Sequence, residues 1–277
     1  MVQIEGRQGT AASCTTPATD GMVVSTRTDQ LWKLRRGIVE LYVSEHPLDC
    51  LTCSANGNCE LQDVAAEVGL REVRYDNEPS NVKRGIDSSN PFFFFDPSKC
   101  IVCSRCIRAC DDLQVTHALS IDGRGFDSRI IAGADESFKE SDCLSCGACV
   151  NECPVGALEE KQLRTAGNPD KWVRTTCGFC GVGCQFDAGI KGNQLVTMKP
   201  ATDSPVNNGH SCVKGRFASA YVNHKERLTT PLIRESIDAE FREASWEEVY
   251  EFITERWKQI LKAVSYTHLT LPTNREV

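Results

Sequence analysis

The spacing of the cysteines constrains this chain more than any other feature of its sequence. The 277 residues contain 16 cysteines, and all but one of them fall into four groups. The groups are Cys50, Cys53 and Cys59; Cys100, Cys103, Cys106 and Cys110; Cys143, Cys146, Cys149 and Cys153; and Cys177, Cys180, Cys184 and Cys212. Disulfides explain this pattern badly, because thiols three residues apart tie a chain only to its own next turn. The spacing instead indicates thiolate ligands for metal.

Two of the groups repeat one run. Residues 100–110 read CIVCSRCIRAC and residues 143–154 read CLSCGACVNECP. This C-x2-C-x2-C-x3-C run is typical of two-cluster ferredoxins, in which the fourth cysteine of each run ligates the other cluster. We therefore expect two crossed [4Fe–4S] sites, one formed by Cys100, Cys103, Cys106 and Cys153, the other by Cys143, Cys146, Cys149 and Cys110. A zinc-binding interaction module is the alternative, although structural zinc usually takes two CxxC pairs a dozen or more residues apart.

Charge and hydropathy exclude several other classes of protein. The formal net charge is −7, which argues against nucleic acid or an anionic membrane as the main partner. No apolar run approaches the roughly 20 residues that span a bilayer, and PFFFFDP at 91–97 is predicted to be a buried core strand. Because no export signal opens the sequence and thiol ligands need a reducing compartment, we expect a cytoplasmic protein.

The first group follows a histidine, in the segment HPLDCLTCSANGNCELQ. It resembles the His-plus-three-Cys [4Fe–4S] site of the large iron–sulfur subunit of complex I, iron-only hydrogenases and NAD-linked formate dehydrogenases. That resemblance implies the ligand set His46, Cys50, Cys53 and Cys59, although the same four side chains could hold zinc. A neutral imidazole in place of a thiolate should raise the reduction potential. Apolar residues at 31, 34, 38, 41 and 42 predict a helix before it, ended by Pro47.

Both ends of the sequence depart from this pattern. SCTTPATDGMVV, residues 13–24, resembles the end of the [2Fe–2S] domain of the same families, which implies that Cys14 is its fourth ligand. The other three ligands would lie upstream, so we expect Met1 to be internal to a longer native chain that alone holds the [2Fe–2S] cluster. A lone structural thiol is the alternative. SYTHLTLPTNREV, residues 265–277, does not continue the family pattern, and we expect a non-native, poorly packed tail.

The fourth group has a different spacing, Cys177-x2-Cys180-x3-Cys184-x27-Cys212. It resembles the N-terminal [4Fe–4S] subdomain of molybdenum or tungsten bis-pterin oxidoreductases, and GHSCVKGRF and RLTTPLIR extend the likeness. The resemblance implies that Lys214 relays electrons between cluster and pterin; a surface lysine is the alternative. Downstream, SWEEVYEFITERWKQILKAV predicts a capped helix, with Ser245 as the N-cap and Glu248 three residues later.

Together these motifs predict an α+β, modular, multi-cluster iron–sulfur protein. The expected domains are 1–30, the C-terminal remnant of a [2Fe–2S] ferredoxin-like domain; 31–85, a [4Fe–4S] domain with one histidine and three cysteine ligands; 86–168, a two-[4Fe–4S] ferredoxin domain; 169–228, the [4Fe–4S] subdomain of a molybdopterin oxidoreductase; 229–263, the start of a pterin-binding region; and 264–277, the non-native tail.

The combination of motifs is similar to the alpha subunit of NAD-dependent formate dehydrogenase. This resemblance implies four [4Fe–4S] clusters here, and a molybdenum or tungsten bis-pterin guanine dinucleotide only in the full-length chain. It implies as partners an FMN/NAD-binding diaphorase subunit and, as a further candidate, a small [2Fe–2S] subunit. No catalytic residue is assigned within these residues, so we expect no formate oxidation by this chain alone. A complex I-type large subunit with a non-catalytic C-terminal domain is the alternative.

Overall fold

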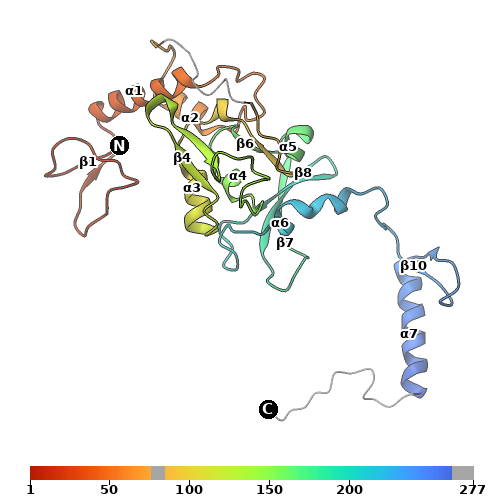
Figure 1. Cartoon of the computed structure of the whole chain (residues 1–277). Helices are drawn as coiled ribbons and strands as arrows, with labels where there is room; N and C mark the ends of the chain where they lie inside the picture. The colour runs from red at the N-terminus through yellow and green to blue at the C-terminus, as the bar shows by residue number, and fades with distance from the viewer. Residues whose placement is uncertain (76–84, 264–277) are drawn as a thin grey trace. The chain divides into compact units, whose positions relative to one another are not determined.

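The computed structural model describes residues 1–75 and 85–263, which belong to two units, Met1–Ala220 and one beginning at Tyr221. One long helix, several short helices and small antiparallel sheets make up the first unit (Figure 1), which confirms the predicted α+β class. The expected non-native tail lies outside the described residues. Within the described residues, no helix has both the length and the apolar character needed to cross a bilayer.

The first unit begins with a small strand pair followed by a long helix. Strand β1 (Gln3–Ile4) pairs antiparallel with β2 (Val24–Ser25). Helix α1 (Asp29–Glu45) begins after Thr28, whose hydroxyl accepts the Leu31 N–H at 3.2 Å. This is the usual way in which a threonine satisfies an unpaired amide of the first helical turn.

Helix α1 confirms the predicted helix, but most of the apolar positions that predicted it are not buried. Leu31 is fully buried, whereas Leu34, Ile38, Leu41 and Tyr42 are 39–46% exposed. The helix instead buries a face that contains Val39, Glu40 and Ser44. After α1 the chain passes through the first cysteine group to α2 (Glu60–Glu67).

The two ferredoxin runs lie in a region built from two strand pairs. β3 (Phe93–Phe95) pairs with β6 (Leu158–Glu160), and β4 (Leu119–Asp122) pairs with β5 (Arg129–Ala132). All three residues of β3 are buried, as predicted for the phenylalanine run. The short helices of this region are η1 (Pro97–Lys99), α3 (Arg105–Arg108), η2 (Ala109–Leu113), η3 (Gly125–Asp127), α4 (Ala148–Glu152) and α5 (Lys161–Ala166).

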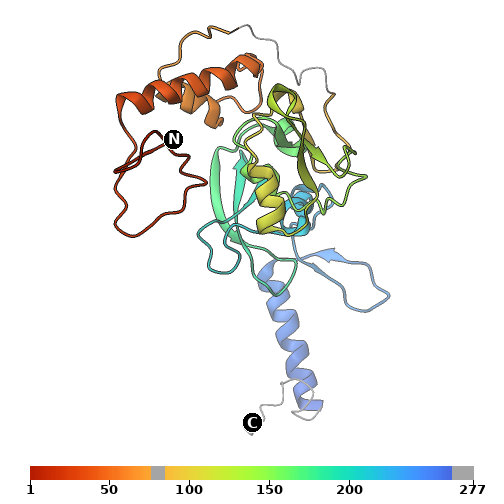
Figure 2. The ribbon, with the colours of Figure 1, turned by 60° about the vertical axis from the view of Figure 1, so that its left-hand side comes forward.

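A three-stranded antiparallel sheet follows, in the order β7 (Lys171–Thr176), β8 (Gln185–Lys191) and β9 (Gln194–Pro200) (Figure 2). Phe186, 1% exposed, lies at the centre of its small core. Helix α6 (Val213–Phe217) contacts β9, and η4 (Ala218–Asn223) follows it.

In its described part, up to residue 263, the second unit has one strand pair followed by a helix. β10 (Leu232–Ile233) pairs antiparallel with β11 (Arg242–Glu243). Helix α7 (Trp246–Ala263) follows Ser245, whose hydroxyl accepts the Glu248 N–H at 3.2 Å. The predicted N-cap is therefore confirmed.

Candidate metal centres

The first ferredoxin run lies beside the cysteine that ends the second run. The pKa of the Cys100 and Cys106 thiols is raised to about 12, mainly by burial and in part by the nearby Cys103 and Cys153. Burial also raises the pKa of Cys153 itself. These four thiols therefore form one group in the crossed arrangement, and ligation would release protons from them because metal binds the thiolate.

The second run lies in the same way beside the cysteine that ends the first. Cys110, Cys143, Cys146 and Cys149 together line one cavity. Burial raises the pKa of Cys149 well above its usual range. After burial, the largest contribution comes from Cys106 of the other group. The two four-thiol groups are therefore neighbours.

Both runs repeat one backbone conformation around their first cysteine. Val102 and Ser145 have φ values of 50° and 54°, and their N–H groups donate to the Cys100 and Cys143 sulfurs, each at 3.4 Å. A left-handed conformation costs a non-glycine residue roughly 1–2 kcal/mol. The surrounding fold holds both loops in this conformation, and the result is an amide that points at a candidate ligand sulfur. Hydrogen bonds to cluster sulfurs are one way in which proteins tune cluster potentials.

The group that begins with a histidine surrounds a cavity of about 250 Å³, lined by His46, Cys50, Cys53 and Cys59. His46 directly follows α1, and its backbone N–H donates to the Val43 carbonyl at 3.2 Å. Burial lowers the pKa of the imidazole, which favours the neutral form that ligates metal. The space greatly exceeds the roughly 30 Å³ that one water occupies in the liquid, so the site has room for a group larger than one ion.

The fourth group forms at the start of the three-stranded sheet. Burial and then Cys177, Cys180 and Cys212 raise the pKa of the Cys184 thiol, so the three other cysteines lie near it. The Cys177 N–H donates to the Cys184 carbonyl at 2.8 Å. Cys180 and Cys212 are exposed, whereas Cys177 and Cys184 are partly buried.

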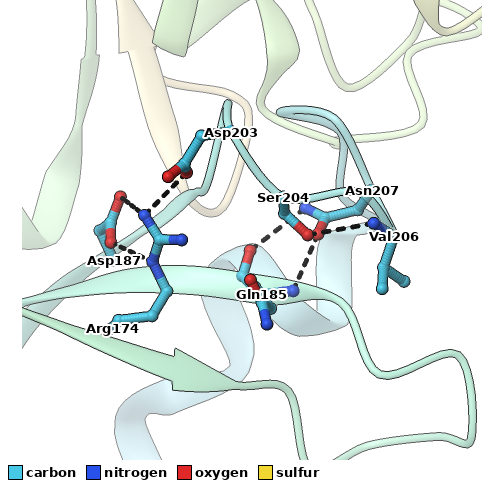
Figure 3. Close-up of polar contacts among 7 residues, drawn as sticks. All are labelled: Arg174, Gln185, Asp187, Asp203, Ser204, Val206 and Asn207. Atoms are coloured by element: carbon cyan, nitrogen blue, oxygen red, sulfur yellow. Dashed lines mark hydrogen bonds and ion pairs between the residues drawn. The ribbon is translucent and has the colours of Figure 1, made fainter.

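The loop between β9 and α6, which leads to Cys212, is held against the sheet by side-chain contacts (Figure 3). The Asn207 side chain accepts the Gln185 N–H at 2.8 Å and donates to the Gln185 carbonyl at 3.2 Å. Arg174 binds Asp187 at 2.7 Å and Asp203 at 2.8 Å, which fastens the same loop to β7 and β8. Sequence reasoning missed these residues, because isolated polar residues in a loop carry no periodic signal.

A buried ion pair joins the fourth group to the ferredoxin region, and sequence reasoning missed it as well. Arg216 on α6 pairs with Glu160 at the end of β6, and their side chains are 1% and 6% exposed. The guanidinium also donates to the Met198 carbonyl at 2.5 Å and to Asn151 Oδ1 at 3.0 Å. The only signal in the sequence was an arginine between a glycine and a phenylalanine, shortly after Cys212.

The remaining candidates lie at exposed positions. Lys214 is exposed on α6, two residues after Cys212, and Cys14 is exposed in the segment between β1 and β2. The roles expected for these two residues stay predictions.

The donor sets suit clusters better than single ions. In residues 1–75 and 85–263, no three His, Cys, Asp or Glu side chains are placed to hold one metal ion. Zinc needs its thiolates about 2.3 Å from a single centre. Three cysteines that follow one another at two-residue gaps, as in both ferredoxin runs, are typical of a multi-iron cluster.

Three segments match known iron–sulfur families. Residues 35–74 match the NADH-ubiquinone oxidoreductase-G iron-sulfur binding region, residues 99–157 match the 4Fe-4S dicluster domain, and residues 170–224 match the molybdopterin oxidoreductase Fe4S4 domain. The chain belongs to the iron–sulfur electron-transfer region of the formate dehydrogenase and NADH-quinone oxidoreductase family.

Relatives of this iron–sulfur region are much longer. It is 32% identical to "Probable oxidoreductase YjgC" of Bacillus subtilis, with 95% of this chain and 30% of the relative covered. It is 30% identical to "Putative formate dehydrogenase SH0748" of Staphylococcus haemolyticus, with 97% of this chain and 31% of the relative covered. For an NADH-quinone oxidoreductase subunit of Rhizobium meliloti, the identity is 33% and the covered shares are 92% and 30%. The chain thus spans about 30% of the length of these relatives.

A solved structure is similar over part of the chain. It is a crystal structure of NAD+-reducing [NiFe]-hydrogenase in the H2-reduced state, with a TM-score of 0.51 and 34% sequence identity. The match covers 58% of this chain and 67% of the hydrogenase chain. The iron–sulfur region is therefore shared with a subunit of an NAD-reducing hydrogenase.

Proposed function

We propose that this chain is the electron-relay part of a molybdenum or tungsten formate dehydrogenase alpha subunit. In this proposal, His46 and the fifteen cysteines of the four groups hold four [4Fe–4S] clusters. Bound clusters of this kind exchange electrons one at a time, at potentials set by ligand type, net charge and hydrogen bonds to sulfur. The observation that carries the proposal is the order in which the four groups contact one another.

The His46 group contacts the first ferredoxin group through the loop after Cys153. A Cβ placed on Gly156 would lie 3.3 Å from the Cys53 sulfur, so the backbone of this loop packs directly against a ligand of the His46 group. The Glu60 N–H, next to Cys59, donates to the Pro154 carbonyl at 2.9 Å.

The fourth group contacts the other end of the ferredoxin pair through α6. A Cβ on Gly147 would lie 2.7 Å from the Phe217 ring, which ends α6, and Gly147 follows Cys146. At the other side of α6, a Cβ on Gly215 would lie 3.4 Å from the Cys177 sulfur. With Cys106 beside Cys149 in the middle, the four groups form a connected series from the His46 group to the fourth group.

A connected series of this kind suits transfer between two separate redox partners. The fourth group would face a bis-pterin metal site, with Lys214 as the relay residue beside it. The His46 group would face the [2Fe–2S] domain and an FMN/NAD diaphorase subunit, in the cytoplasm. The name of the staphylococcal relative, putative formate dehydrogenase, supports formate as the substrate of the longer protein.

The second candidate is a complex I-type subunit, favoured by the 33% identity to an NADH-quinone oxidoreductase subunit. Its C-terminal domain would be a scaffold without catalysis. The complete second ferredoxin run argues for the formate dehydrogenase. The large iron–sulfur subunit of complex I, which the chain also resembles, usually keeps only the last cysteine of that run. Formate-dependent NAD reduction by the longer protein, with molybdenum or tungsten analysis, would distinguish the two.

Anaerobic reconstitution of the 277-residue chain tests the proposal directly. We expect four [4Fe–4S] clusters, hence about sixteen irons per chain, and no formate oxidation. His46→Ala should disturb one cluster and leave the ferredoxin pair, because the eight cysteines of that pair are separate from the His46 group. Iron analysis and EPR would measure this.

The matched control is His117→Ala, since His117 is 65% exposed and lies outside the four groups. It should keep all four clusters. Loss of every cluster signal in His46→Ala, or formate turnover by this chain, would contradict the proposal.

A further inference from the structure

We propose that Lys99 sets the reduction potential of the His46 group by placing a fixed positive charge against the Cys53 sulfur. The inference rests on the proposed function, because it requires a cluster in that group. Lys99 would not be a ligand. Its charge would influence which cluster of the series holds the electron.

The backbone of Lys99 is held rigidly beside the first ferredoxin group. Lys99 ends η1, and the Cys100 N–H that follows donates to the Pro97 carbonyl at 3.1 Å. Asp96, 9% exposed, caps this turn by accepting the Ser98 N–H at 3.0 Å. Lys99 is therefore joined covalently to one candidate cluster site while its side chain extends to another.

The side chain of Lys99 ends against the His46 group. Its Nζ lies 3.4 Å from the Cys53 sulfur and 3.7 Å from Asp49 Oδ2, and the side chain is only 14% exposed. Its stem passes along the loop after Cys153, where a Cβ on Gly156 would lie 3.7 Å from Lys99 Cδ. These contacts fix the ammonium at the ligand sulfur and shield it from water.

A positive charge in this place favours the state with one more electron. Its effect falls with distance and grows as water is excluded, so the cluster ligated by Cys53 should feel it most. The imidazole of His46 acts in the same direction, since it removes one negative charge from the ligand set. Both features would hold the electron preferentially at the His46 end of the series.

Redox titration of the reconstituted 277-residue chain tests this inference. Dithionite would donate one electron to each cluster, and EPR would follow the His46-group signal, identified by its change in His46→Ala. Lys99→Met keeps the stem and removes the charge. In this variant we expect the electron occupancy of the His46-group cluster, relative to that of the ferredoxin pair, to fall at least tenfold. This corresponds to a reduction potential lower by about 59 mV for a one-electron couple.

Three further variants make the result specific. Lys99→Arg keeps the charge and should restore the potential. Asp49→Asn removes the opposing negative charge and should raise the potential of the same cluster. Lys33→Met removes an exposed lysine of α1 and should change nothing.

Each outcome decides a separate question. An unchanged potential in Lys99→Met, or an equal shift of all clusters, would overturn the role of Lys99 while the proposed function stands. If Lys99→Met lost the cluster, Asp49→Asn would decide, since an unchanged potential there overturns the inference and a raised one supports it. If the wild-type chain held no cluster that depends on His46, the proposed function itself would fail.

Discussion

Replacing Arg216 by methionine should destabilise the first unit more than any surface substitution. The guanidinium and the Glu160 carboxylate are nearly inaccessible to water, with side chains 1% and 6% exposed. Arg216 also donates to the Met198 carbonyl and to Asn151. Methionine keeps the apolar stem and removes the guanidinium group, so Glu160 would remain as an uncompensated buried carboxylate, apart from the hydroxyl of Thr197 at 3.0 Å.

Removing one partner of a buried ion pair typically costs about 3–5 kcal/mol. We expect a loss within this range for Arg216→Met. Because the loss comes mainly from the stranded carboxylate, a double variant with Glu160→Gln should recover at least about 1 kcal/mol of it, as residues in direct contact are coupled by about 0.5–3 kcal/mol.

Unfolding of the reconstituted protein by guanidinium chloride, followed by circular dichroism and visible absorption, would measure these changes. Arg174→Met is the matched control, because Arg174 also binds two carboxylates but its side chain is 42% exposed. It should shift the unfolding midpoint far less. A loss below about 1 kcal/mol for Arg216→Met, well under the buried-pair range, or a double variant no more stable than the single one, would refute the reasoning.

Three further substitutions test other parts of the first unit. The hydrogen bonds from the side chain and backbone of Arg74 lower the pKa of Glu40 to about 2. The folded chain therefore keeps Glu40 ionised at pH values where the unfolded chain protonates it, so this contact stabilises the fold above about pH 4.5 and is lost as pH falls toward 2. Between pH 6 and pH 4, the urea unfolding midpoint should fall more in wild type than in Glu40→Gln. An equal fall in both would contradict this. Gly215→Ala would place a Cβ 2.7 Å from the Phe186 ring and should cost about 1–3 kcal/mol through overpacking. Gly37→Ala in α1, with open space around it, should instead stabilise by about 0.5–1 kcal/mol, and equal thermal shifts in both alanine variants would be inconsistent with the packing.

Local signals in the sequence were enough for several elements. The Ser245 cap and the buried strand Phe93–Phe95 both followed from patterns within a few residues. The helix before His46 also formed as its spacing predicted. A cap, a short apolar run or a helical period depends on neighbours along the chain, so a sequence read residue by residue contains it.

The sequence by itself therefore predicted the cysteine groups, since most of their members lie within a few residues of one another. The tertiary structure decided which groups adjoin and what surrounds them. Lys99 reaches Cys53 across 46 residues of sequence, and Arg216 reaches Glu160 across 56. No periodic pattern in the sequence connects positions so far apart, because their contact depends on how β3 pairs with β6 and how α6 packs on β9. For the same reason, the buried face of α1 was set by its partners, including Arg74 against Glu40, rather than by its apolar spacing.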